Sequence, residues 1–433
     1  MKLLKVFTKP NILILFFLII ATFISYLIEF NLKANSNQYF WCVNVKNDFV
    51  LPIIGNIKLP IHCDEGPYLS AISSVEYFFS EVNPYQKRPL WILSLSSIFS
   101  LYTFIFDPLL SEYQIFRLTT FTLQLMVSFF ISKLLVDYLK INTSKLLNYF
   151  PIFVLVLFPY IRWNIFFPSH GNLTLLATIL SLYIMKNGFI EVNNINLTYI
   201  ILGILTLAHR SFLAFGFLLL IYFIYHRNLK VRKFYSVLQL MLPTILYEMF
   251  VYISPYNSYD WNKAEYNQFY WILDLFQSKQ TKTSGEFCQS FQTFFVCNLE
   301  ITFNYLYLFM IPISFLIVLL ITTKLLNKNI SYLSDLLYIS IGIYFFWSVQ
   351  GWYPEFRFIN YSVGYLILLS LIMTIEKLDG KKYIGYSSLI IFYFSIDYLQ
   401  PYSLVGLELN AINIISIFMF CLYLLNLVSI KRK

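Results

Sequence analysis

The sequence predicts an all-α, polytopic integral membrane protein, and three observations carry this prediction. Of the 433 residues, 58% are hydrophobic and only 12% are charged. The apolar residues fall in runs of roughly 17 to 25 residues, the length that a helix needs to cross a bilayer. Lysines and arginines gather in short clusters between the runs, as they do in cytoplasmic loops. We therefore expect a single membrane domain over residues 1–433, with about 12 to 13 transmembrane helices.

The first predicted span lies in the amino-terminal stretch "MKLLKVFTKPNILILFFLIIATFISYLIEF". This stretch has a basic start and a long apolar run, but it lacks the small-x-small pattern at which a signal peptide is cleaved. We therefore expect an uncleaved helix over 12–29, with the amino terminus in the cytoplasm.

The remaining apolar runs follow along the chain, each bounded by polar or charged residues. They predict spans over 90–106, 118–136, 149–161, 171–185, 197–208, 211–225, 234–252, 303–321, 335–349, 357–375, 383–399 and 411–429. The cation clusters expected in the cytoplasm are "HRNLKVRK" (226–233), "TKLLNK" (323–328), "EKLDGKK" (376–382) and the terminal "KRK". With these clusters inside, the spans from 234 onward alternate, and the carboxyl terminus is also cytoplasmic.

The same alternation places 254–300, 350–356 and 400–410 on the outer side, and the first span places 30–89 there too. The loops 30–89 and 254–300 hold most of the extramembrane residues, and we expect them to form a joint cap. Within the first loop, "YLSAISSVEYFF" has apolar residues at helical spacing, which predicts an interfacial helix. Between 107 and 210 the alternation fails unless two short segments merge or one re-enters the membrane.

The net charge of +9 does not indicate a nucleic-acid partner, because the cations are divided among the clusters between spans. Four of the five cysteines fall in the two long outer loops: Cys42, Cys63, Cys288 and Cys297. In an oxidising compartment, Cys42 with Cys63 and Cys288 with Cys297 would form disulfides. The alternative is four unrelated thiols.

Asp64 and Glu65 form an acidic pair in the first outer loop. Adjacent carboxylates can bind a divalent cation or accept a proton from an attacking hydroxyl, although a solvated acidic turn has the same sequence. Lys87 and Arg88 stand beside Pro89 at the mouth of the second predicted span. They are either ligand-binding cations or snorkelling side chains at a helix start.

Ionisable residues also lie within or beside apolar runs, where they are costly and therefore indicate function. They are His170 in "FFPSHGN" and the pair His209 and Arg210 in "TLAHRSF". The alternatives are a hydrogen-bonded turn at His170 and a capped helix break at His209 and Arg210.

Together these features resemble the C-type (GT-C fold) glycosyltransferases, multi-span enzymes that use polyprenyl-phosphate sugars and include the protein O-mannosyltransferases and aminoarabinose transferases. The resemblance begins with a first span, an early acidic motif, an interfacial helix and "RPL" at the second span. It continues in "FRLTTFTLQLMVSFFISKLL" (116–135), "GILTLAHRSFLAFGFLLLIYFIYHR" (203–227) and "WYPEFRFINYSVGYLILLSLI" (352–372). Phe358 and Tyr361 stand where the family's late motif usually has Tyr and a Pro-containing turn.

The resemblance implies roles for particular residues. Asp64 would be the catalytic base or the ligand of a divalent cation such as Mg²⁺ or Mn²⁺, with Glu65 beside it in the motif. Arg357 would hold the lipid phosphate, because its forked donors suit a phosphate at headgroup depth; its alternative role is an interfacial anchor. The remaining substrate-binding candidates are Arg88, His170, Arg210 and Glu355.

The expected activity is inverting transfer of a sugar from a polyprenyl-phosphate donor to a hydroxyl of a glycan, lipid or protein acceptor. We expect it at the outer face of a bacterial plasma (inner) membrane, where membrane lipids surround the chain. Two rival functions stay open. One is a lipid-linked glycan polymerase or ligase; the other is a membrane transporter or flippase, for which two related halves or helices broken at matching positions are typical.

Overall fold

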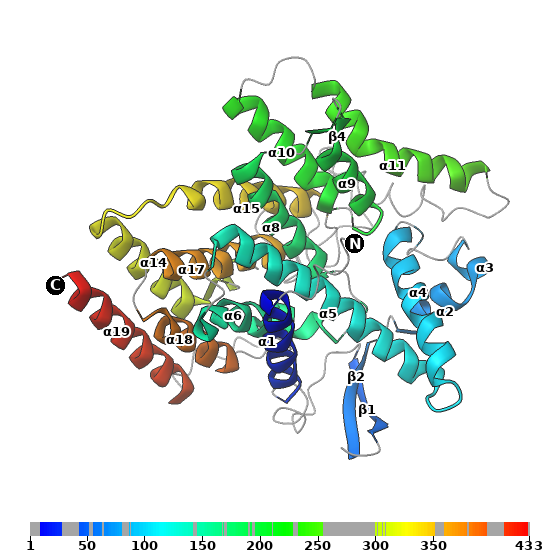
Figure 1. The fold of residues 1–433 in the computed structure, drawn as a ribbon, viewed down its shortest axis with the longest axis horizontal. Helices are drawn as coiled ribbons and strands as arrows, with labels where there is room; N and C mark the ends of the chain where they lie inside the picture. Colours follow the sequence, from blue (N-terminus) through cyan, green and yellow to red (C-terminus); the bar gives the residue numbers. More distant parts are fainter. Residues whose placement is uncertain are drawn as a thin grey trace.

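The computed structural model describes most of the chain, with gaps. The described residues are 9–27, 43–51, 55–62, 65–79, 86, 88–141, 145–166, 168, 171–188, 191–192, 195–209, 211–227, 233–253, 299–300, 302–304, 306–307, 309–350, 359–378, 381–395 and 411–431. Within them the architecture is predominantly helical, as the sequence predicts (Figure 1).

Every predicted span overlaps a helix of the structure. In the first half these helices are α1 (Lys9–Tyr26), α4 (Pro89–Phe106), α5 (Glu112–Leu139), α6 (Phe150–Leu157), α7 (Pro159–Asn164), α8 (Gly171–Asn187), α9 (Leu197–Thr206) and α10 (Ser211–Arg227). In the second half they are α11 (Lys233–Ile253), α14 (Met310–Leu325), α15 (Ser331–Gln350), α17 (Tyr365–Leu378), α18 (Lys382–Ser395) and α19 (Ala411–Lys431). A 3-10 turn, η4 (Leu146–Tyr149), precedes α6, and a π-helical turn, η5 (Asn360–Gly364), precedes α17.

Long apolar helices indicate a membrane protein. Among the described residues, five helical stretches are long and apolar enough to cross a bilayer. They are Lys9–Tyr26, Pro89–Phe106, Glu112–Leu139, Tyr235–Ile253 and Tyr361–Leu378. Other apolar helices, such as α9, are shorter.

Two helical regions are broken, each for a local reason. Phe158 separates α6 from α7 with an extended conformation (φ −56°, ψ 128°), because the ring of Pro159 disfavours the α region for the residue before it. Proline then serves well as the first residue of α7, where its missing N–H costs nothing. The second break lies between α9 and α10, at His209, close to where the sequence also suggested one.

The segment 30–89, which was expected to be an outer loop, contains more than the helix expected within it. That helix is present as α2 (Glu65–Ser73) and α3 (Val75–Phe78), separated by Ser74, whose side chain accepts the Tyr77 N–H and caps α3. Before it, β1 (Val43–Leu51) pairs antiparallel with β2 (Gly55–His62), and a second small ribbon pairs β3 (Glu191–Val192) with β4 (Ile195–Asn196). No strands were expected here, although "VNVK" alternates apolar and polar residues in the way typical of a strand.

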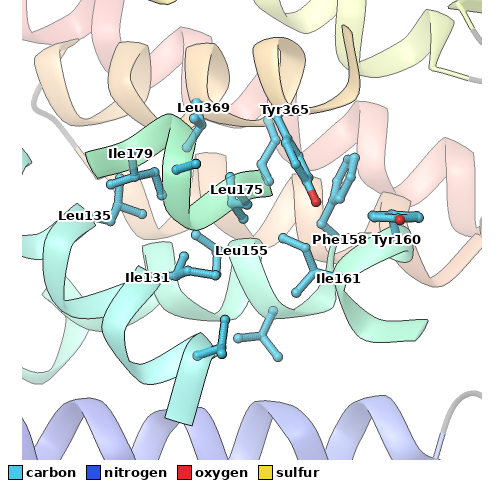
Figure 2. Packing of buried hydrophobic residues seen from close by; sticks show 14 of the residues in the cluster. Ile131, Leu135, Leu155, Phe158, Tyr160, Ile161, Leu175, Ile179, Tyr365 and Leu369 are labelled. Atoms are coloured by element: carbon cyan, nitrogen blue, oxygen red, sulfur yellow. The ribbon is translucent and has the colours of Figure 1, made fainter. Parts of the chain in front are cut away.

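The centre of the bundle is formed by α5, α6, α8 and α17. Figure 2 shows their interdigitating side chains, among them Ile131 and Leu135 of α5, Leu155 of α6, Leu175 and Ile179 of α8, and Leu369 of α17, all fully buried. Outer helices such as α11 and α19 instead leave many large apolar side chains exposed. The described core is therefore surrounded by helices whose outer sides suit contact with lipid.

Contacts between α5 and α8 define two ends of this bundle. At one end the Asn172 Nδ2 donates to the Gln124 Oε1 (3.3 Å), and at the other the Lys186 Nζ donates to the Tyr138 carbonyl (2.5 Å). The two helices therefore run in the same direction. We call the end near Asn172, where the α7–α8 connection lies, the junction face, and the end near Lys186 the opposite face.

Candidate functional site

Most of the sequence-predicted site residues lie outside the described residues. These are Asp64, His170, Arg210, Glu355 and Arg357, together with Cys42, Cys63, Cys288 and Cys297. Glu65 is the first residue of α2, and Arg88 is the half-buried N-cap residue of α4. For the remaining candidates, the structure describes only residues that flank them in the sequence.

The start of α4 joins two of these flanks. The indole Nε1 of Trp91 donates to the carbonyl of Pro168 (3.0 Å), two residues before His170. The backbone N–H of Leu90 donates to the carbonyl of Leu207 (3.1 Å), three residues before Arg210. The segments that carry Arg88, His170 and Arg210 therefore meet at one place, although they are far apart in sequence.

Ring contacts join the late segment to the same place. The ring of His209 lies 5.7 Å from that of Trp347, and Trp347 lies 5.2 Å from Tyr361. Trp347 and Tyr361 flank the segment of Glu355 and Arg357 on its two sides. The hydroxyl of Tyr160 donates to that of Tyr361 (2.8 Å), which ties α7 to the same rings.

We call the five buried residues of these contacts, Trp91, Tyr160, His209, Trp347 and Tyr361, the junction cluster. They come from α4, α7, the α9–α10 break, α15 and the η5 turn, so the cluster depends on the packing of the whole junction face. Four chain segments with cationic or acidic residues adjoin these buried aromatic residues.

Gly171 permits the close approach of α7 and α8 beneath this cluster. A Cβ added to Gly171 would lie 2.5 Å from the Tyr160 hydroxyl oxygen and 3.2 Å from the Asn164 Oδ1. Any side chain there would displace Tyr160, whose hydroxyl bonds to Tyr361. The absence of a side chain at Gly171 therefore leaves room for Tyr160 to keep its place in the cluster.

His209 has a defined role at its helix break. Its Nδ1 lies 2.6 Å from the Ser211 Oγ and 3.3 Å from the Ser211 backbone nitrogen. Because a backbone N–H can only donate, Nδ1 accepts, and the proton of the neutral ring is on Nε2. His209 thus caps the start of α10, which agrees with the capped helix break considered from the sequence.

Two buried arginines were missed as site candidates. Arg162 is fully buried in α7, where its Nη1 donates to the Tyr393 carbonyl of α18 (3.1 Å). This carbonyl is in the last turn of α18, where helical partners run out. Arg117 of α5 is also buried. The cost of a charge within an apolar run, which singled out His209 and Arg210, also applies to Arg162 at the end of span 149–161.

Glu65 of the acidic pair begins a helix, α2, that packs against α4. The Ser96 Oγ of α4 donates to the Ile72 carbonyl near the end of α2 (3.0 Å), and Glu65 begins the same helix. A helix of this length spans about 12 Å. Among the described residues no group of three His, Cys, Asp or Glu side chains could hold a metal ion; Asp64 is not one of those residues.

No family model, curated protein or solved structure matches this chain.

Proposed function

We propose that this protein is an inverting sugar transferase that uses a polyprenyl-phosphate donor at the outer face of a bacterial plasma membrane. The junction cluster is the observation that supports the proposal best. It gathers the flanks of Arg88, His170, Arg210 and the Glu355–Arg357 segment at one face of the helical bundle. Cations converging from separate segments suit a phosphate held at the depth of lipid headgroups.

In the proposed reaction, the Asp64 carboxylate takes the proton of the acceptor hydroxyl. The hydroxyl oxygen attacks the anomeric carbon of the sugar, while the bond from that carbon to the phosphate oxygen breaks on the opposite side. The configuration inverts, and the polyprenyl phosphate leaves with the electron pair of the broken bond. Arg357 stabilises the charge on the departing phosphate. A divalent cation at Asp64 would supply further positive charge.

The membrane arrangement is part of the proposal. Placing the lysine clusters in the cytoplasm puts Lys186 and the opposite face inside and the junction face outside. The loops 30–89 and 254–300 then form a cap over the junction cluster, and both termini are cytoplasmic. A donor with a lipid tail remains in the membrane beside the site, so that its phosphate stays at this depth.

Replacing Asp64 with Asn tests the catalytic assignment, because the change removes the charge and keeps the shape. We expect the transfer rate to fall by a factor of about 10² to 10⁴. The measurement follows sugar transfer from a labelled polyprenyl-phosphate sugar in membranes that contain the protein. Asp107→Asn, an exposed position in the α4–α5 turn, is the matched control and should keep full activity. Full activity in Asp64→Asn would remove Asp64 from the mechanism.

Replacing Arg357 tests the phosphate assignment by donor binding. Arg357→Ala should weaken binding of a short-chain polyprenyl-phosphate sugar in detergent. Arg357→Lys should restore little of it, because a point charge does not reproduce a bidentate grip. Unchanged binding in Arg357→Ala, with a loss in Arg210→Ala, would move the phosphate site to the break between α9 and α10.

One observation favours a transporter as the second candidate. α9 ends and α10 begins at the buried His209, and transporters often place a substrate at such broken helices. Uptake or flipping of a lipid-linked sugar in proteoliposomes, without formation of a transfer product, would support this candidate over the transferase.

A further inference from the structure

α4 has the composition of a crossing helix but not the surroundings of one. Its 18 residues have a mean hydropathy of 1.6 and contain no charged side chain, and the sequence analysis predicted a span there. A helix that crosses beside α5 and α8 would begin at one face of the bundle and end at the other.

Both ends of α4 instead contact the junction face. Near its start, Trp91 bonds to Pro168. Near its end, the Tyr102 hydroxyl lies 2.9 Å from the Thr122 Oγ1 of α5. Phe121, the neighbour of Thr122, stacks on Phe166 with 6.2 Å between the ring centroids. Phe166 lies only two residues before Pro168.

The length of α5 supplies a scale for these contacts. About 21 Å of helix separates Gln124 at the junction face from Tyr138 at the opposite face. About 16 Å of helix separates Trp91 from Tyr102, and yet both lie at the level of Phe166 and Pro168. α4 therefore runs across the direction of α5. Figure 1 shows the two helices diverging from the turn that connects them.

This arrangement removes the failure of alternation between 107 and 210. If α4 stays at the junction face, α5 crosses to the opposite face, the α6–α7 pair returns, and α8, α9 and α10 continue the alternation. Together with α1, α11, α14, α15, α17, α18 and α19 this gives about twelve crossings, with both termini on one side. No segments need to merge.

We propose that α4 lies on the lipid leaflet at the junction face as an interfacial helix that does not cross the membrane. Exposed side chains on this helix and in the turn after it include Leu93 (63% exposed), Phe104 (86%) and Leu109 (79%). So much apolar surface is costly in water, whereas contact with lipid carries no such cost.

The leaflet is favoured over a second protein chain because the surface is continuous with a lipid-facing side of the bundle. The exposed side chains Met126 and Phe130 continue along α5 from the α4 contact towards the opposite face. They lie between Gln124 and Tyr138, within the part of α5 that spans the bundle. The inference does not depend on the proposed enzymatic function.

Cysteine labelling of the turn tests the inference. In the full chain with its native cysteines replaced by Ser, Ser111→Cys marks the α4–α5 turn. Ser73→Cys in α2 marks the junction side, and Ser331→Cys at the start of α15 marks the opposite side; all three serines are exposed. With a membrane-impermeant maleimide we expect Ser111→Cys and Ser73→Cys to react from the same side and Ser331→Cys from the other. Reaction of Ser111→Cys together with Ser331→Cys would overturn the inference.

Depth measurement supplies an independent readout. A nitroxide at Ser97→Cys, the exposed middle of α4, is compared with one at Phe130→Cys, the exposed middle of the spanning part of α5. An interfacial α4 places the first label near the headgroups, so its spectrum should respond more to a polar relaxing agent and less to oxygen than that of the second. Equal depth of the two labels would overturn the inference, because the middle of a crossing helix lies at the bilayer centre.

Discussion

α4 and α8 are both predicted spans, but α4 is mostly exposed and α8 is mostly buried. α4 contains apolar, hydroxyl and aromatic side chains and is mostly exposed. α8 carries Asn172, Thr174, Thr178 and Ser181, and all four are buried. The helix with more polar groups is thus the interior one. When the solvent is lipid, a strongly apolar surface indicates contact with solvent, and small or polar residues indicate contact with other helices.

The physical reason is that lipid tails are as apolar as leucine. Burial of apolar surface between helices therefore gains little hydrophobic free energy in the membrane, and association depends on close packing and interhelical hydrogen bonds. α8 has both: Gly171 and Ala177 are buried small residues, and Asn172 bonds to Gln124 of α5. Such contacts hold α8 against its neighbours at the junction face.

The largest expected difference between the two helices is the cost of truncating a leucine. Leu175 of α8 is fully buried, whereas Leu101 of α4 is 54% exposed. Leu175→Ala leaves a cavity in a packed interior and should lower the free energy of unfolding by about 2 kcal/mol, the low end for such changes because no transfer from water is lost. Leu101→Ala should change it by under about 0.5 kcal/mol.

Unfolding by sodium dodecyl sulfate in mixed micelles measures both variants under one condition. Equal losses in Leu175→Ala and Leu101→Ala would contradict the contrast between α8 and α4, since they would mean that α4 is also packed inside the protein.

A smaller effect is expected from adding one methyl group to each of two glycines. Gly171→Ala brings a Cβ against Tyr160, and overpacking of this kind costs about 1 to 2 kcal/mol. Gly66 in α2 has no atom within 4 Å of the position of an added Cβ. Gly66→Ala should therefore stabilise the helix slightly, by about 0.5 kcal/mol, through its higher helix propensity. Thermal unfolding in detergent compares the two variants.

The two glycine variants also test the role of the junction cluster. Because Tyr160 bonds to Tyr361, Gly171→Ala should alter the fluorescence of the neighbouring Trp347, and Gly66→Ala should not. With the remaining tryptophans replaced, an unchanged Trp347 spectrum in Gly171→Ala would mean that Tyr160 does not transmit the displacement.

Hydropathy was sufficient to locate the helices but not to place them in space. Each apolar run became a helix because an isolated backbone in lipid must satisfy its own hydrogen bonds. The same rule does not distinguish a crossing helix from one lying in the interface, so the apolar run of α4 by itself predicts only a helix. The break at Phe158 follows from Pro159 alone, but the sequence analysis treated 149–161 as a single span.

The candidate site shows a similar division. The sequence indicated segments with unusual ionisable residues, and the structure brings the flanks of four of them together through Trp91, His209, Trp347 and Tyr361. Apart from His209, which its ionisable ring singled out, these aromatic residues give no signal in a chain with 45 Phe, 35 Tyr and 7 Trp, because most such residues are expected in the interfacial belt. Only the three-dimensional packing distinguishes the few that form the junction cluster.

The smallest expected effect concerns the hydrogen bond between Asn172 and Gln124, and it tests whether polar groups hold α8 in the interior. Asn172→Leu and Gln124→Leu each leave the other side chain without this partner, so each single change should destabilise the protein. In the double variant the hydrogen bond is lost only once, so its loss in free energy of unfolding should be smaller than the sum of the two single losses. A double-mutant cycle by dodecyl sulfate unfolding should give a coupling free energy of about 0.6 kcal/mol, the average for such pairs in membranes.

The α4 counterpart is the bond between Tyr102 and Thr122, tested by Tyr102→Phe and Thr122→Val. Because α4 lies at the edge of the bundle, where headgroups and water replace a lost partner, its coupling should be smaller. A larger coupling at Tyr102 and Thr122 than at Asn172 and Gln124 would reverse the contrast between the two helices.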